Sequence, residues 1–166
     1  MSSKTRALAL TDVGQLATLA ANSTDPGALY RALARIGQET IGWRLFTILS
    51  YVESAGAVER LYSSDETAYP VGGRKPLDKI AVSHAALAAG EIFLAANREE
   101  VRAAFFDHAL IFSLGISAIL NVPIRHAGRR LGTLNFCGEE GMYGAAEVAA
   151  AKVLAALLVG SLLELP

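Results

Sequence analysis

Residues Ser117–Gly138 read SAILNVPIRHAGRRLGTLNFCG, and this stretch decides the fold. Two apolar runs, Ser117–Arg125 and Arg129–Gly138, flank the short polar link His126-Ala127-Gly128, a pattern typical of a tight β-hairpin. Because both runs are apolar at nearly every position, we expect both faces of the hairpin to be covered. The pattern therefore predicts two central strands of a sheet, with helices on one face and a functional site on the other.

Helix and strand patterns alternate on either side of this hairpin. Asp25-Pro26 marks a helix start, because aspartate caps a helix and proline suits its first turn. The expected helices are 11–22, 26–41, 77–89, two short ones beginning near Asn97 and Asp107, and 145–163; the other expected strands are 43–52, 58–63 and 92–95. Two hairpins joined by a mainly helical crossover predict one α+β domain with an antiparallel sheet.

Composition limits the partners of this chain. The net charge is −1, from 15 basic and 16 acidic residues, and the basic residues are scattered. Nucleic-acid binding relies on a concentrated basic surface, so we expect no nucleic-acid partner. Cys137 is the single cysteine, which excludes an internal disulfide and a cysteine-based zinc cluster.

Two apolar segments bear on location. The N-terminal MSSKTRALAL has too short an apolar run for a signal peptide. Val153–Leu163 is uncharged, but a membrane-spanning helix needs about 20 such residues. We therefore expect a cytoplasmic protein without a membrane partner.

The hairpin also carries a resemblance to a known family. The pattern S-x-x-x-x-V-P-I from Ser117 to Ile124, followed by G-x-x-L-G-T-L-N-F from Gly128 to Phe136, resembles the final hairpin of GAF domains. The resemblance runs from the helix at 26 through the last helix. It implies a GAF/PAS-like central antiparallel sheet, with N- and C-terminal helices on one face and a helical crossover that roofs a pocket on the other.

Strand alternation predicts which side chains face that pocket. On the last strand Thr133, Asn135 and Cys137 share one face, and this polar face is the better candidate for the ligand side. The matching sets on the other central strands are Ser117, Ile119, Asn121 and Pro123, and Trp43, Leu45, Thr47 and Leu49. The alternative is that the two asparagines are buried amides that only hydrogen-bond within the sheet.

The loop before the crossover adds further candidates. Arg60, Tyr62, Ser64 and Tyr69 form a polar and aromatic cluster, and the following Gly72–Lys75 could hold an anion on backbone N–H groups; an ordered surface loop is the alternative. Asp107 lies in the crossover, where it either caps a helix or faces the pocket. The candidate ligand-binding residues are therefore Trp43, Thr47, Tyr62, Ser64, Tyr69, Asp107, Ser117, Ile119, Asn121, Asn135 and Cys137.

Catalytic interpretations find less support. Gly42-Trp43 and the hairpin motifs are similar to free methionine-(R)-sulfoxide reductases, whose chemistry needs several thiols, and only Cys137 is present. The resemblance also leads us to look for the cysteine–histidine pair of bilin-binding GAF domains and the Asn-Lys-Phe-Asp-Glu signature of cyclic-nucleotide GAF domains, and the sequence has neither. We expect no catalytic residue, metal or cofactor, with Cys137 as a small buried core residue.

The terminal helices predict a second kind of contact. Apolar residues cover much of the circumference of the last helix: Ala149, Val153, Leu154, Leu157, Leu158 and Leu162. A helix that is apolar nearly all round is buried on two sides, so we expect a homodimer formed with the helix at 26–41. The alternative is that the segment 11–22 folds back over this ridge. We divide the chain into an N-terminal helical extension, 1–24, and a GAF domain, 25–166.

These observations together predict a stand-alone bacterial sensory or regulatory module. An unknown small molecule would bind non-covalently, close the crossover over the pocket and change the terminal helices that form the dimer. An enzyme acting on a small metabolite through Asp107 or Tyr62 and a purely structural dimerisation module are the alternatives.

Overall fold

The computed structural model describes residues 5–165, so the first four residues of the predicted extension and Pro166 lie outside this range. Six strands form one antiparallel sheet in the order β3-β2-β1-β6-β5-β4. The strands are β1 (Leu45–Val52), β2 (Ala57–Ser63), β3 (Arg74–Pro76), β4 (Phe93–Ala95), β5 (Ala118–His126) and β6 (Arg129–Gly138). The predicted α+β fold class is confirmed, and the predicted hairpin lies in the sheet interior.

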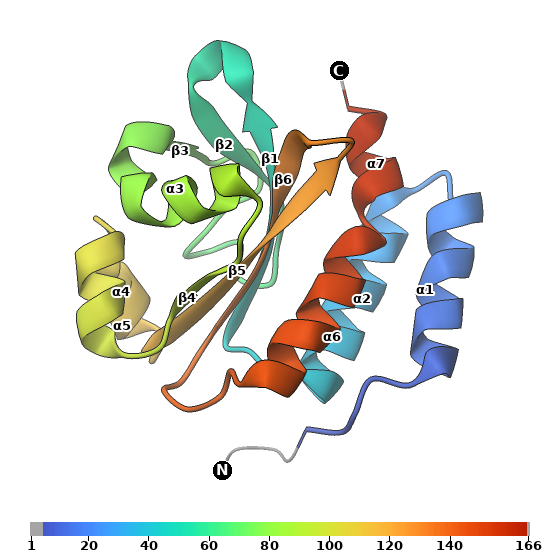
Figure 1. Cartoon of the computed structure of the whole chain (residues 1–166), viewed down its shortest axis with the longest axis horizontal. Helices are drawn as coiled ribbons and strands as arrows, with labels where there is room; N and C mark the ends of the chain where they lie inside the picture. Colours follow the sequence, from blue (N-terminus) through green and yellow to red (C-terminus); the bar gives the residue numbers. More distant parts are fainter. Residues whose placement is uncertain (1–4, 166) are drawn as a thin grey trace.

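Helices cover both faces of this sheet (Figure 1). On one face lie α1 (Leu10–Asn22), α2 (Pro26–Thr40), α6 (Ala145–Ala156) and α7 (Val159–Leu163). On the other lies the crossover between β3 and β5, which contains the 3-10 helix η2 (Leu77–Ile80), α3 (Ala81–Ala89), α4 (Arg98–Ala104) and α5 (His108–Ser113). A second 3-10 helix, η1 (Glu53–Ala55), joins β1 to β2. The layering is therefore helices, sheet, crossover.

The β5–β6 hairpin turns through two residues rather than the three of the predicted link. His126 pairs with Arg129, so only Ala127 and Gly128 form the loop. Their φ angles are 48° and 78°, and two successive positive values are what the tightest hairpin turns require. Glycine adopts this region freely, whereas Ala127 is held there by the strand pairing on both sides.

The two faces of the sheet carry two separate cores, as the alternation of β5 and β6 predicts. Leu120, Val122, Leu134 and Phe136 are buried against the terminal helices. Ile119 and Cys137 belong to the second core, together with buried residues of the crossover. Each central strand thus contributes alternate side chains to each layer.

The last predicted helix, 145–163, is divided in the structure. At Leu157 and Leu158 the backbone N–H groups bond to carbonyls three residues back, to Leu154 and Ala155, which tightens the chain and separates α6 from α7. Leu158 and Leu162 are both buried, and α7 lies on β5 and β6. Sequence periodicity does not reveal this break because the apolar residues continue through it.

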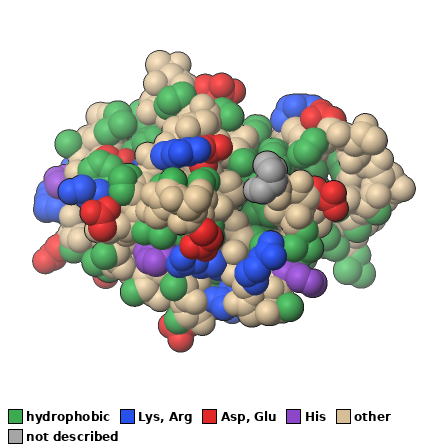
Figure 2. All heavy atoms as spheres, turned by 90° about the horizontal axis from the view of Figure 1, so that it is seen from above, with side chains coloured by type: hydrophobic (Ala, Val, Ile, Leu, Met, Phe, Trp, Pro, Cys, Tyr) green, Lys and Arg blue, Asp and Glu red, His purple; other side chains and the backbone are tan. Residues whose placement is uncertain are grey.

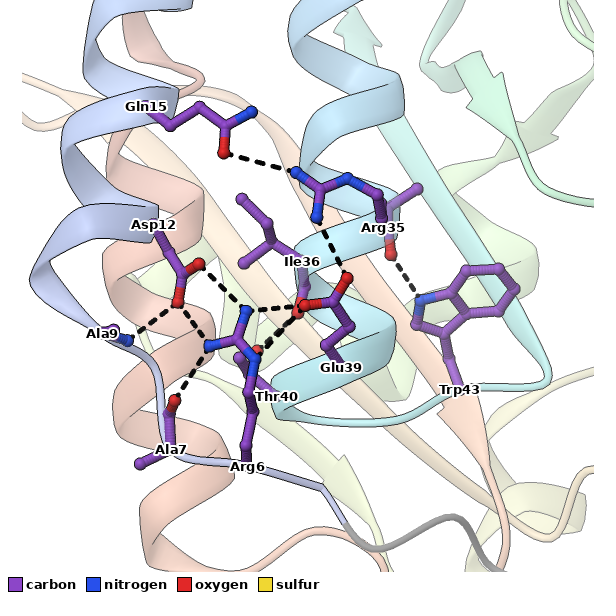
Figure 3. Close-up of polar contacts among 11 residues, drawn as sticks. Arg6, Ala7, Ala9, Asp12, Gln15, Arg35, Ile36, Glu39, Thr40 and Trp43 are labelled. Carbon is purple, nitrogen blue, oxygen red and sulfur yellow. Dashed lines mark hydrogen bonds and ion pairs between the residues drawn. The ribbon is translucent and has the colours of Figure 1, made fainter.

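The N-terminal helix covers part of the apolar ridge formed by the terminal helices. α1 packs against α2 and α7, and Leu16 is fully buried there. Arg6 ties the segment down through Asp12 and Glu39, with N···O distances of 2.6 Å to each carboxylate (Figure 3). The segment 11–22 therefore folds back over part of this ridge. Val153 and Leu163 stay exposed beside it, and the homodimer remains a prediction.

The surface and the helices add two observations on partners. Figure 2 shows lysine and arginine side chains interspersed with acidic ones over the face seen from above. Among residues 5–165, no helix combines the length and the apolarity that crossing a bilayer requires. The absence of a nucleic-acid partner remains a prediction.

Candidate functional site

A cavity of about 70 Å³ lies between the sheet and the crossover. On a comparable measure about 10–15 Å³ holds one water, so the space fits a compound of a few non-hydrogen atoms. Its floor is made by β1, β5 and β6, one wall by β2, β3 and the loop around Tyr69, and its roof by η2, α3 and α5. Most lining residues are apolar, and the polar ones lie on the floor, on the wall and, as Ser83 and His84 of α3, on the roof.

The polar part of the floor is one hydrogen-bonded row across three strands. Thr47 of β1 pairs with Asn135 of β6, which pairs with Asn121 of β5. The Asn121 Nδ2 donates to Asn135 Oδ1 at 2.8 Å, and Asn135 Nδ2 donates to the hydroxyls of Thr47 and Thr133 at 3.2 and 3.1 Å. The two amides therefore line the cavity and also bond to each other, which combines the two interpretations that the sequence left open.

The wall of the cavity contains a buried arginine. Arg60 is 5% exposed, and its guanidinium carbon lies 5.0 Å from the centroid of the Tyr69 ring. The Nη1 atom donates to the carbonyl of Pro70 at 2.8 Å, whereas the buried Nε atom has no hydrogen-bond partner among residues 5–165. Burial lowers the pKa of Arg60, because removal from water disfavours the charged form.

Asp107 connects the crossover to this wall. Its Oδ2 accepts a hydrogen bond from the Tyr69 hydroxyl at 2.9 Å and forms an ion pair with Lys75 Nζ at 2.6 Å. The Oδ1 atom is buried without a partner among the described residues. Burial, together with this carboxylate, raises the pKa of Tyr69 above its ordinary value. Asp107 occupies the N-cap position of α5, but its side chain forms no capping bond.

A β-bulge decides which residues of β2 face the cavity. Ile48 pairs with Tyr62, but the next residue, Leu49, pairs with Arg60, so Leu61 is an extra residue in β2. Arg60 therefore shares the cavity face with Leu49. Tyr62 turns to the helix face, where its ring packs against Tyr30 and Phe46 with centroid distances of 6.4 and 5.9 Å. The prediction that Tyr62 faces the pocket is wrong, because simple alternation cannot register the bulge.

Trp43 is also on the helix side, contrary to the prediction. Its indole Nε1 donates to the carbonyl of Ala34 in α2 at 3.0 Å (Figure 3). Its ring lies 6.0 Å from that of Phe46. The strand begins only at Leu45, so the alternation of β1 does not extend back to Trp43. Leu45, Thr47 and Leu49 do line the cavity as predicted.

Two serines from the candidate set accept hydrogen bonds from backbone N–H groups instead of lining the cavity. The Ser64 hydroxyl accepts a hydrogen bond from the backbone N–H of Phe46, and the Ser117 hydroxyl accepts one from Glu140, both at 2.9 Å. Pro123 and Asp107 likewise lie outside the lining. The predicted candidates that do line the cavity are Thr47, Tyr69, Ile119, Asn121, Asn135 and Cys137. The structure shows that these residues line the cavity. That they contact a ligand remains a prediction.

Several lining residues escaped prediction. Ile80, His84 and Leu87 come from η2 and α3, and no short-range pattern relates these elements to the central strands. Arg60 and Lys75 were predicted only as parts of the loop region before the crossover, and both line the cavity. Within residues 5–165, no group of three or more histidine, cysteine or carboxylate side chains is placed to hold a metal ion.

The environment of Cys137 predicts an unreactive thiol. Burial raises the pKa of Cys137 to about 12, so roughly 10⁻⁴ of the thiol is ionised at pH 8, and only the thiolate reacts. We expect iodoacetamide to modify the native protein at least 100-fold more slowly than the protein in denaturant. Because Cys137 is the single cysteine, mass spectrometry reports this rate directly. Equal rates in the two states would show that the cavity floor is open to solvent.

This layering and the cavity define the fold as that of GAF domains, as the resemblance implied. The GAF domain of a phosphoenolpyruvate-protein phosphotransferase from Coxiella burnetii superposes with a TM-score of 0.75 at 15% identity, over 93% of this chain and 91% of that one. The GAF domain of a two-component sensor histidine kinase from Bacillus halodurans gives 0.71 at 12% identity, over 84% and 95%. Free methionine-R-sulfoxide reductase from Neisseria meningitidis, solved with its substrate, gives 0.72 at 16%, over 96% and 94%. The sequence matches no protein-family model and no curated protein.

Proposed function

We propose that the cavity binds a small molecule non-covalently and that the protein acts as a sensory or regulatory GAF-type domain. The observation that carries this proposal is the cavity itself, an apolar space with a few convergent polar groups, one of them the incompletely bonded Arg60. Such spaces are the usual form of small-molecule sites. The similar folds include GAF domains of a sensor histidine kinase and of a phosphotransferase, which supports a regulatory role.

The contacts around Asp107 suggest how binding would be transmitted. Asp107 belongs to the crossover, while its partners Tyr69 and Lys75 belong to the wall. A ligand that touches both would favour the closed arrangement of the crossover, which is a population shift. The floor strands carry Leu134 and Phe136 on their opposite face, against the terminal helices. We therefore propose that the signal passes through β5 and β6 to α2 and α6, and from there to a second copy of the chain.

The structure weakens the enzymatic alternative at one of its two residues. Tyr62 packs on the helix side, on the other face of the sheet from the cavity. The carboxylate of Asp107 is engaged by Lys75 and Tyr69. The homodimer, the cytoplasmic location and the bacterial origin remain predictions.

Native mass spectrometry of the freshly purified protein, followed by thermal-shift screening with small metabolites, tests the binding proposal. A ligand at 100 times its Kd stabilises the folded state by about 2.7 kcal/mol, which for this size corresponds to a rise in Tm of roughly 5–10 °C. We expect at least one compound to give such a rise.

A cavity-filling variant supplies the control. Ile119 lies on the floor, and Ile119→Phe adds volume to the cavity side of β5 without touching the terminal helices. The stabilisation by the same compound should disappear in this variant while cooperative melting persists. Leu87→Phe, on the roof, repeats the test if Ile119→Phe does not fold. A compound that stabilises all three proteins equally binds elsewhere and contradicts the proposal.

A further inference from the structure

Arg60 is a buried cation without a counter-ion. Its side chain forms no ion pair with any acidic side chain among residues 5–165, and the one side-chain hydrogen bond that it donates in this range goes to the carbonyl of Pro70. A guanidinium stays charged at every physiological pH. Buried charges are normally paired, because an isolated one loses its hydration without compensation. Asp107 acts on Arg60 only through its charge, from beyond ion-pair distance, so the guanidinium has no direct counter-ion among the described residues.

The other charges at the cavity wall compensate one another. Lys75 pairs with Asp107 at 2.6 Å, and both side chains are mostly buried. Elsewhere on the lining, His84 Nε2 lies 2.7 Å from Nη1 of Arg130, which is itself paired with Glu53. Because the guanidinium of Arg130 can only donate, Nε2 of His84 accepts this hydrogen bond, and the imidazole ring is neutral. The wall thus carries one positive charge in excess, and that charge is on Arg60.

One edge of the guanidinium forms no hydrogen bond with the described residues. Nη1 is held by the carbonyl of Pro70, and Gly73 leaves room for it, since a Cβ at Gly73 would lie 2.7 Å from this atom. The unpartnered Nε and its neighbour Nη2 form the side of the guanidinium, and this pair of donors matches the two oxygens of a carboxylate. A carboxylate bound there satisfies the buried Nε and neutralises the excess charge with a single negative charge.

The remainder of the cavity is suited to a hydrocarbon. Leu45, Leu49, Val58, Ile80, Phe105 and Ile119 surround it, and the floor amides are already bonded to each other. The volume of about 70 Å³ limits the compound to a few non-hydrogen atoms. A phosphate would bring more charge than the single excess cation balances, and an ammonium group would face Arg60 and Lys75.

We infer that the ligand of this cavity is a small monocarboxylate, whose carboxylate binds the Nε–Nη2 edge of Arg60 and whose short apolar body contacts the leucine and isoleucine side chains. This inference rests on the proposed function, because it names the class of compound that the same cavity binds.

Isothermal titration with a matched pair of probes tests the inference on the unmodified protein. The probes are 3-methylbutanoate and its neutral, equally shaped amide, 3-methylbutanamide, with leucine and inorganic phosphate as further compounds. We expect 3-methylbutanoate to bind at least tenfold more tightly than the amide, and leucine and phosphate to bind more weakly than the acid.

Two variants locate the discrimination. Arg60→Gln should weaken binding of the acid at least tenfold and leave binding of the amide unchanged. Arg74→Gln is the matched control, because Arg74 lies nearby on β3 but is exposed and paired with Glu59, and it should change neither affinity. If Arg60→Gln does not fold, Arg60→Lys replaces it, since lysine retains the charge but not the two-donor edge, and it should reduce the preference for the acid.

The outcomes separate this inference from the proposed function. Equal or tighter binding of the amide overturns the carboxylate inference and leaves a small-molecule site in place. Tighter binding of leucine or phosphate than of the acid overturns it as well, in favour of a zwitterion or a dianion. If none of the four probes binds while a neutral metabolite raises the Tm, only the inference fails; if no compound binds in either experiment, the proposed function fails too.

Discussion

Gly132→Ala is expected to lower the free energy of unfolding by about 3 kcal/mol or more, at the upper end of the cost of overpacking a core. A Cβ at Gly132 would lie 2.1 Å from the carbonyl oxygen of Leu49 and 2.6 Å from Cδ2 of Leu162. The first of these atoms belongs to the backbone of β1, which is fixed by its pairing with β6. The methyl group therefore forces apart two central strands. Urea unfolding measures the change.

Gly160→Ala is the control for this prediction. Gly160 lies in α7, where an added Cβ meets no atom within 4 Å. The substitution should raise stability by about 0.5–1 kcal/mol, because alanine favours the helix more than glycine does. If Gly132→Ala were as stable as the unaltered protein, the register of β1 against β6 and the position of α7 would both be wrong. The same clash explains physically why glycine precedes Thr133 in the motif of the last strand.

Asp107→Ala is expected to lower the free energy of unfolding by about 3 kcal/mol, the lower end for breaking a buried ion pair. The side chains of Lys75 and Asp107 are 17% and 13% exposed, so the lysine left behind is poorly hydrated. The Tyr69 hydroxyl loses its acceptor in the same variant. Denaturant unfolding, with near-ultraviolet circular dichroism to follow the tyrosines, measures both effects.

A double variant separates the ion pair from the hydrogen bond. Lys75→Met removes the uncompensated charge, so Asp107→Ala combined with Lys75→Met should recover more than half of the loss, because apolar replacements of a buried pair are tolerated. Additive losses in the double variant would mean that Asp107 and Lys75 do not interact. In that case the connection between crossover and wall would have to lie elsewhere.

The central part of the fold was predictable because it depends on local pattern. Ile119, Asn121, Asn135 and Cys137 lie on the cavity face as alternation along β5 and β6 predicts. Both strands are regular through this region, and their pairing shifts only beyond Ile124. The hairpin link was one residue too long in the prediction, which alters the turn but not the faces.

The wall of the cavity could not be predicted in the same way. Arg60 faces the cavity and Tyr62 does not because β2 has a bulge opposite Ile48 and Leu49. Such a bulge is a property of the paired strands rather than of β2 alone. The contact of Asp107 with Lys75 and Tyr69 joins residues 32 and 38 positions apart through the fold of the crossover. Sequence spacing placed Asp107 at the start of α5 correctly, yet it could not show which side chains meet there.

The coverage of the terminal helices was left open by the sequence for a similar reason. An apolar helix face indicates that something covers it, without indicating which segment does. The ion pairs of Arg6 with Asp12 and Glu39 show that α1 and the chain before it are held against α2. Because α1 covers part of the ridge, any dimer would use a smaller apolar area than the sequence alone indicates, although Val153 of α6 is still 41% exposed.

A crystal structure of the protein grown with 3-methylbutanoate tests the central claim most directly, because it locates the carboxylate relative to Arg60. The arrangement of the wall predicts density for the compound inside the cavity, with its two oxygens within hydrogen-bond distance of Nε and Nη2 and its methyl groups toward Ile119. Density for the compound only at the surface, or an Arg60 guanidinium paired with a side chain of the protein instead, would contradict it.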